Sequence, residues 1–396
     1  MPIDDKIKIG LMFPTSGTQS WAGLECIEAA EIALAIAEED GLIQPGQVEL
    51  LKGDVHSSET AATEARRFIA QGAKILHGTI LSSWVPPAAK IAQDNGVLYL
   101  EAIAASEEIH QYNFGNFFRV NVDCLSYGEG IAEFIANVLA PAWNLPVDRV
   151  RVATVYQSDS FCQSLVESFS KKALAKGMRI VDRQLVNQTE SDFRPVIRSL
   201  MAKQVDVLVV ATYRGPTPNF WVQAVDEHFL PRAFFGTGSW ALGQYVKQIG
   251  DLANGLYAVG TPHIVAIKTS ALSADAKQYL AKWKKRTGKQ HTDRTAVDRD
   301  LVMIALRVLF ERVLPRASSL RLDDLRKALL AVDIPMGSTI LGYGVKFSES
   351  GDNTRSFPAI MQWQQGRLET IYPSIISTKI PWTTTLSELS TSPRHD

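Results

Sequence analysis

Small and hydroxyl-bearing residues stand at two places in the segment 78–106 where ligand chemistry is expected. Ser82-Ser83 follows one apolar run, and Ala104-Ala105-Ser106 follows the next. A helical pattern from about Pro86 to Asn95 separates the two runs, so the segment predicts strand, loop, helix, strand and loop. The carboxyl ends of parallel strands meet at one sheet edge, where open α/β sheets bind ligands. Hydroxyl groups and the unpaired N–H groups of a helix start favour an anion there, although an ordinary βαβ unit with polar loops fits the pattern equally well.

The familiar enzyme signatures are missing from the sequence. There is no G-x-x-x-x-G-K-[ST] phosphate loop, no G-x-G-x-x-G turn, no H-E-x-x-H motif and no G-x-S-x-G nucleophile elbow. Ser168–Lys171 fits S-x-x-K, but it falls inside a predicted surface helix, where a chance match is the better interpretation. We therefore expect a binding protein rather than an enzyme, with no catalytic residue, no metal and no cofactor.

Length, composition and charge restrict the class of protein further. A chain of 396 residues with 46% hydrophobic and 21% charged residues should form two lobes, each with a sizeable core. The net charge of -1 gives no general basic field for nucleic acid. No apolar run reaches the roughly 20 residues of a membrane span. The three cysteines, Cys26, Cys124 and Cys162, lack metal-ligand spacing, and we expect them to be buried small hydrophobic residues.

Strand-like and helix-like patterns alternate along the chain. The first series has apolar runs near 7–13, 48–51, 75–77, 97–100 and 117–122. A second series has runs near 150–156, 179–186, 205–212, 234–236 and 256–260. Helical patterns separate the runs, so the sequence predicts two α/β lobes, each with a doubly wound parallel sheet. After three further helices, we expect a strand meander at 344–347, 358–364 and 369–372 and a loosely attached tail at 379–396.

Several stretches, taken in order, resemble one known family. They are IKIGLMFPTSG at 7–17, GTILSSWVPPAAKIAQDNGVLYLEAIAAS at 78–106, FFRVNVDC at 117–124, and a late G…F…G…F…W…G pattern between 342 and 373. Over Lys6–Pro373 the chain resembles the leucine/isoleucine/valine-binding type of periplasmic solute receptors, which serve branched-chain amino acid ABC transporters.

The resemblance implies the type I periplasmic binding protein fold. In that fold two doubly wound lobes are joined by three crossovers and close like a hinge on one small solute. We expect an N-terminal lobe of 1–121 plus 261–342, a C-terminal lobe of 122–260 plus 343–375, and a tail at 376–396.

The resemblance also implies where the ligand is held. Ser82 falls where the family places a serine hydroxyl on the ligand carboxylate. Ala104 and Ala105 fall where backbone and a hydroxyl hold the same group. Ala105 lacks that hydroxyl, and Ser106 beside it is the expected replacement.

Aromatic residues form a second group of candidates. The resemblance places Phe161 where a ring closes over the ligand and Tyr213 where a tyrosine faces it. Trp21 and Trp84 lie in or beside predicted loops, where they can either line a pocket or pack in a core.

Gly238 is the main departure from the family pattern, because amino-acid binders place a glutamate there against the α-ammonium. An unpaired ammonium in a buried site is costly. An amino-acid ligand would need another acid, Glu101 or Asp159, although Glu101 can equally pair with a loop amide. The sequence therefore favours a carboxylate-bearing solute, with an organic or aromatic acid ahead of an amino acid.

We therefore expect the monomeric solute receptor of an ABC importer, which docks transiently on a membrane permease and binds no nucleic acid. The start of the chain has no basic-then-apolar leader. Either a leader has been removed from a periplasmic protein, or the chain is a cytosolic ligand sensor of the same fold, similar to the amide-responsive regulators.

Overall fold

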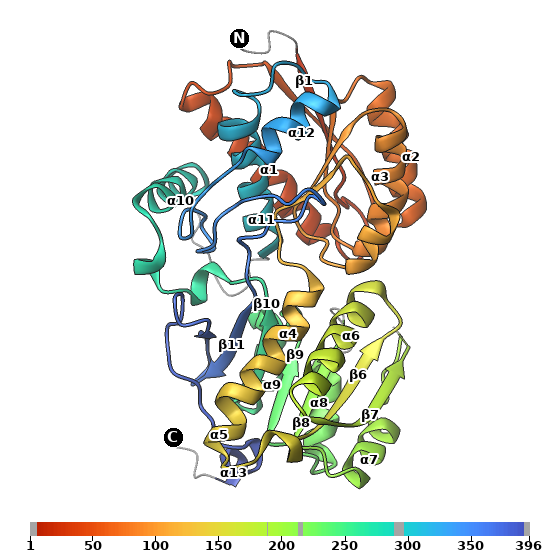
Figure 1. Cartoon of the computed structure of the whole chain (residues 1–396), viewed down its shortest axis with the longest axis vertical. Helices are drawn as coiled ribbons and strands as arrows, with labels where there is room; N and C mark the ends of the chain where they lie inside the picture. The colour runs from red at the N-terminus through yellow and green to blue at the C-terminus, as the bar shows by residue number, and fades with distance from the viewer. Residues whose placement is uncertain (1–5, 188, 213–216, 289–296, 392–396) are drawn as a thin grey trace. The chain divides into compact units, whose positions relative to one another are not determined.

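The computed structural model describes residues 6–187, 189–212, 217–288 and 297–391. They pack as two compact units, which are both drawn in Figure 1. Unit 1 lies within Met1–Asp123, Leu272–Gln290 and Ala296–Ser356, and unit 2 lies mainly within Cys124–Ala271 and Phe357–Asp396.

Unit 1 contains a parallel sheet in the order β2-β1-β3-β4-β5. The strands are β1 (Ile7–Leu11), β2 (Val48–Lys52), β3 (Ile75–His77), β4 (Leu98–Glu101) and β5 (Phe117–Arg119). Ile9 of β1 pairs with Leu50 of β2 on one side and with Ile75 of β3 on the other. The order of strands reverses at this point, so the switch point of the sheet lies between β1 and β3.

Helices cover both faces of this sheet (Figure 1). On one face α1 (Ser20–Glu39) packs against α11 (Val297–Val308), and on the other α2 (Ser58–Ala70) packs against α3 (Val85–Asp94). The unit also contains α10 (Ala274–Thr287), which contacts α1, and α12 (Leu322–Leu330), which contacts β4. Because helices shield both faces, every residue of β3 and β4 is buried.

Unit 2 contains a sheet in the order β12-β11-β10-β9-β8-β6-β7. Its parallel strands are β6 (Arg151–Gln157), β7 (Arg179–Val186), β8 (Val207–Ala211), β9 (Ala233–Gly236) and β10 (Tyr257–Gly260). The late strands β11 (Ala359–Gln364) and β12 (Arg367–Tyr372) extend the sheet in antiparallel pairing. The switch point of this sheet lies between β6 and β8.

In unit 2, α4 (Cys124–Phe134) packs along α6 (Ser160–Ala175). A glycine permits the close approach, since a Cβ on Gly128 would lie 2.4 Å from the Phe169 backbone N. The other helices are α5 (Ala140–Ala142), α7 (Arg194–Ala202), α8 (Thr217–Asp226), α9 (Gly243–Ile249) and α13 (Leu386–Thr391). No helix in the described ranges is both long and apolar enough to cross a membrane.

The doubly wound architecture predicted from the alternating patterns is confirmed, and the three cysteines are buried as expected. Two local expectations are wrong. The segment 344–347 forms only isolated bridges, such as the one between Ile334 and Val345, and joins neither sheet. The first part of the tail is ordered rather than loosely attached. The Trp143 Nε1 donates to the Thr383 carbonyl at 2.8 Å, and this hydrogen bond ties the tail to the rest of unit 2.

Candidate functional site

Ser82 lies in the short 3₁₀ turn Ser82–Trp84, between the end of β3 and the start of α3. Its side chain is 2% exposed, and its hydroxyl oxygen accepts the Ser106 N–H at 3.2 Å. The structure therefore brings together the two loops that the sequence singled out. Within the described part of the chain no acceptor is assigned to the Ser82 hydroxyl proton, which leaves this O–H available as a donor.

Glu101, the last residue of β4, fixes both of these loops. Its Oε1 accepts the N–H groups of Ala102, Ile103 and Ala104 at 2.9, 2.7 and 3.0 Å. Its Oε2 accepts the N–H of Thr79 in the loop after β3, at 2.8 Å. Full burial raises the pKa of Glu101 to about 7, although these four N–H groups favour the carboxylate. Of the two interpretations of Glu101, pairing with loop amides is therefore confirmed.

The backbone N–H of Ala105 differs from its neighbours. The preceding three amides donate to Glu101, and the following one, of Ser106, donates to Ser82. Across residues 102–106 only the Ala105 N–H has no acceptor among the residues that the structure describes. Ala104 and Ala105 carry the smallest chiral side chains, so a ligand can approach this backbone closely.

The hydroxyl of Ser106 accepts the N–H of Glu108 at 3.2 Å and thereby caps the next 3₁₀ turn. Its predicted contact with a ligand stays a prediction. The side chain of Ser83 is exposed, whereas Trp84 is 7% exposed and starts α3 from within the core. Trp21 lies in the first turn of α1 and is partly exposed.

Asp54 organises the loop after β1, on the other side of the switch point. Its carboxylate accepts the N–H groups of Thr15 and Ser16 at 2.7 and 3.0 Å, and the Ser16 hydroxyl at 2.7 Å. Desolvation opposes its ionisation, but these hydrogen bonds prevail and lower the pKa of Asp54 to about 2. Asp54 therefore fixes the turn that follows β1.

In unit 2, the loop after β6 leads into α6. The Asp159 Oδ1 accepts the Phe161 N–H at 2.8 Å, so this acid caps the helix. The Phe161 ring is partly exposed and lies edge-on to Tyr127, with ring centroids 6.3 Å apart. Tyr213, with Arg214, falls in the connection between β8 and α8 and lies outside the described residues.

Gly238 begins a 3₁₀ turn just after β9. A Cβ at this position would meet nothing closer than the Val259 carbonyl oxygen at 3.9 Å, which is ordinary van der Waals contact. Its φ lies outside the left-handed region. The backbone at this position would therefore accept a Cβ, but this chain has no side chain there.

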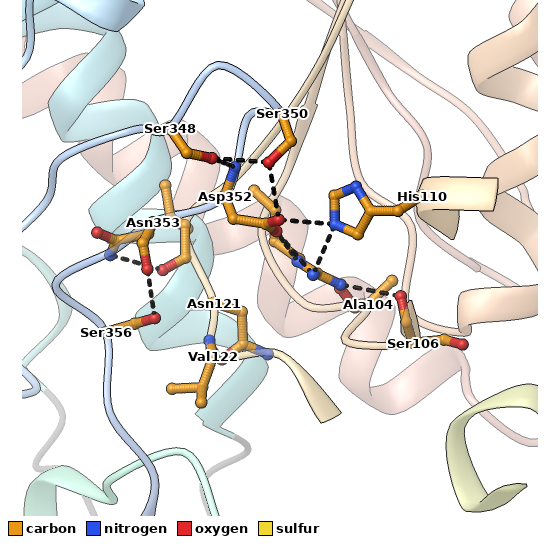
Figure 2. A network of polar contacts seen from close by, with 12 residues as sticks. Ala104, Ser106, His110, Asn121, Val122, Ser348, Ser350, Asp352, Asn353 and Ser356 are labelled. Carbon is orange, nitrogen blue, oxygen red and sulfur yellow. Dashed lines mark hydrogen bonds and ion pairs between the residues drawn. The ribbon is translucent and has the colours of Figure 1, made fainter. Parts of the chain in front are cut away.

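Sequence reasoning missed a polar network in unit 1, shown in Figure 2. Arg119, at the end of β5, is fully buried and forms an ion pair with Asp352, which also lies 2.7 Å from the His110 Nε2. Burial opposes ionisation of Asp352, but its contacts with His110 and Arg119 lower its pKa. The signal was present in FFRVNVDC, because an arginine that ends an apolar strand needs a buried acceptor.

The chemistry of these positions favours an anion over a cation. Unit 1 offers the Ser82 O–H and the Ala105 N–H near its switch point, and both are donors. The acids Asp54, Glu101 and Asp159 already accept backbone N–H groups. Among the described residues, no cluster of His, Cys, Asp and Glu could hold a metal ion.

Comparison with known proteins identifies the family. The family model described as "Periplasmic binding protein" matches residues 6–367. Leu/Ile/Val-binding protein homolog 7 of Brucella suis biovar 1 (strain 1330) is 27% identical over 378 residues, which cover 94% of this chain and 92% of that protein.

Two solved structures share the fold. The leucine binding protein LivK of Thermotoga maritima MSB8 superposes with a TM-score of 0.77 at 20% identity, over 92% of this chain and 97% of that one. A solute binding protein of an ABC transporter from R. palustris, solved in complex with 4-hydroxybenzoate, gives a TM-score of 0.75 at 18% identity, over 98% and 99% of the two chains. Both sheets therefore have the type I arrangement, and the chain belongs to the periplasmic binding protein family.

Proposed function

We propose that this protein is the solute receptor of an ABC importer and that its solute carries a carboxylate but no α-ammonium. The observation that carries the proposal is the pair of free donors in unit 1, the Ser82 O–H and the Ala105 N–H, beside a Glu101 whose oxygens already accept four amides. A hydrogen bond to a charged group contributes about 1.5–3 kcal/mol, so two such donors favour an anionic end clearly over a neutral one.

The same residues disfavour an α-ammonium. Glu101 and Asp159 were the acids expected to replace the missing glutamate, and each already accepts backbone N–H groups. Gly238 brings no side chain of its own. Neither carboxylate is free of its own loop, so an α-ammonium would have to share its acid with backbone N–H groups, and this cost favours an organic or aromatic acid.

The names of the relatives include both classes of ligand. The LivK protein is described as a leucine binding protein, and the R. palustris protein was solved with 4-hydroxybenzoate. We propose an aromatic acid as the first candidate, with Phe161, Tyr213 and Trp21 supplying apolar contact to its ring.

The remaining parts of the proposal follow from the family. We propose that the protein works in the periplasm as a monomer, that its two units close on the solute at three crossovers, and that the loaded form docks on a membrane permease. Small-angle scattering with and without solute tests the closure, since a closing receptor has a smaller radius of gyration when loaded.

A ligand screen by thermal melting and calorimetry tests the proposed class. A ligand present at 100 times its Kd stabilises the folded state by about 2.7 kcal/mol, which raises the melting temperature by several degrees. We expect 4-hydroxybenzoate and related acids to do so, and leucine and 4-hydroxybenzamide to have little effect. A larger shift with leucine than with every acid would contradict the proposal.

A further inference from the structure

The charged network of Figure 2 lies against the loop 104–106 in unit 1. The guanidinium of Arg119 is fully buried, and its Nε and Nη2 both donate to the Asp352 Oδ1, at 3.0 and 2.7 Å. The His110 Nε2 lies 2.7 Å from the other oxygen of Asp352. The backbone of Asp352 also forms an isolated parallel β-bridge with Arg119, the last residue of β5. The acid is thus fixed by side chain and backbone together, and it holds the guanidinium in one orientation.

The remaining nitrogen of Arg119 reaches the loop itself. Its Nη1 donates to the Ser106 carbonyl at 3.1 Å and, over a longer distance of 3.4 Å, to the Ala104 carbonyl. A guanidinium is planar and rigid, so the pair with Asp352 also fixes where Nη1 points. Arg119 therefore draws these two carbonyl groups toward the interior of unit 1.

The contact between Arg119 and the Ala104 carbonyl also determines the direction of the Ala105 N–H. The carbonyl of Ala104 and the N–H of Ala105 belong to the same peptide group. A trans peptide is planar, so its C=O and N–H point in opposite directions. When the Ala104 carbonyl turns toward Arg119, the Ala105 N–H must turn away from it. This explains why that amide alone finds no acceptor in the described part of the loop, while Glu101 and Ser82 take its neighbours.

We propose that Arg119, held by Asp352 and His110, is a positioning residue that turns the Ala104–Ala105 peptide so that its N–H donates to the anionic end of the solute. This inference rests on the proposed function and deepens it. It assigns a task in ligand recognition to a residue that does not itself touch the solute.

The variant Arg119→Lys tests the inference, because lysine keeps the charge opposite Asp352 but loses the rigid fork that reaches the carbonyls. Arg326→Lys is a matched control. The Nη1 and Nη2 of Arg326 also join two backbone segments of unit 1, through the carbonyls of Gly115 and Glu349 at 3.0 and 2.9 Å, and neither segment belongs to the loop 104–106.

Two measurements separate the role of Arg119 from a general effect on folding. Hydrogen exchange of the ligand-free protein reports how firmly the amides of 102–106 are held, and calorimetry with 4-hydroxybenzoate and 4-hydroxybenzamide reports the preference for an anion. We expect Arg119→Lys to speed exchange in 102–106 by about tenfold and to lower the affinity for the acid by about tenfold, with less effect on the amide. Arg326→Lys should change neither value by more than about twofold.

Unchanged exchange in 102–106 would overturn the inference whatever the ligand, and so would an acid-to-amide affinity ratio equal to that of the wild type. If Arg119→Lys did not fold, Asp352→Asn would replace it, since asparagine keeps the size and one acceptor oxygen, and the same two outcomes would decide. If the wild type bound neither compound, the proposed function would fail, and the exchange measurement alone would decide whether Arg119 fixes the loop.

Discussion

Replacing Gly238 by glutamate should change the ligand preference of this protein from an organic acid toward an amino acid. The backbone accepts a Cβ, because outside the neighbouring residues the nearest atom would lie 3.9 Å away and φ lies outside the left-handed region. The family resemblance places a glutamate of amino-acid binders at this point. A paired charge buried with its ligand is worth about 2–4 kcal/mol relative to the unpaired one, which corresponds to a factor of about 30 to 1,000 in affinity. We therefore expect Gly238→Glu to bind leucine more tightly than the wild type by about that factor.

Calorimetric titration with leucine and with 4-hydroxybenzoate measures the affinity for each ligand class. The variant should lose affinity for 4-hydroxybenzoate, which has no ammonium to neutralise the new carboxylate. Gly238→Gln is the matched control, since it has the same size without the charge, and it should not gain affinity for leucine. An equal gain in both variants, or a wild type that already prefers leucine, would refute the reasoning.

Three further outcomes follow from single residues. Burial lowers the pKa of His77 from 6.5 to about 4, so the unfolded chain takes up this proton first as pH falls, and His77 should remove about 3 kcal/mol of stability between about pH 6.5 and 4. Glu101, whose pKa is raised to about 7, acts in the opposite direction over nearly the same range, so the contribution of His77 is the difference between the urea-unfolding pH profiles of the wild type and His77→Gln, and identical profiles would contradict it. Ser82→Ala leaves the Ser106 N–H without its acceptor, so it should lower stability by about 1–3 kcal/mol and the affinity for the acid by about tenfold in melting and calorimetric assays. Ser83→Ala, at an exposed neighbour, should leave the melting temperature unchanged, and an equal loss of stability in both variants would contradict the role of the Ser82 hydroxyl. Gly351 has a φ of +88° and a Cβ there would lie 2.0 Å from a carbonyl oxygen of β5, so Gly351→Ala should destabilise the protein by more than about 2 kcal/mol, and an unchanged melting temperature would exclude the close contact.

The sequence predicted most of the fold because buried parallel strands and amphipathic helices have different periods. The bounds of β3 and β7 agree with the expected ranges, since turn residues delimit each pattern. Prediction failed where local pattern does not decide the outcome. The helical patterns at 124–140 and 298–313 are continuous in sequence, yet π-helical turns at Ile135–Leu139 and Leu309–Val313 interrupt them.

The candidate site could be predicted only in part. The resemblance pointed to Ser82 and to the loop after β4, and the structure links these two by a hydrogen bond. The role of Glu101 was undecided in the sequence, because a carboxylate that ends a strand can face either a ligand or its own loop. The sequence indicated that Arg119 needs a buried acceptor but could not identify Asp352 as that acceptor, since the two residues stand 233 positions apart and only the folded backbone brings them together.

A crystal structure of the protein with bound 4-hydroxybenzoate is the most direct test of the proposed ligand class and binding mode. We expect one carboxylate oxygen at about 3 Å from both the Ser82 Oγ and the Ala105 N, with no acidic side chain near the ligand. A carboxylate bound away from these two donors, or a co-purified amino acid whose ammonium contacts Glu101 or Asp159, would contradict it.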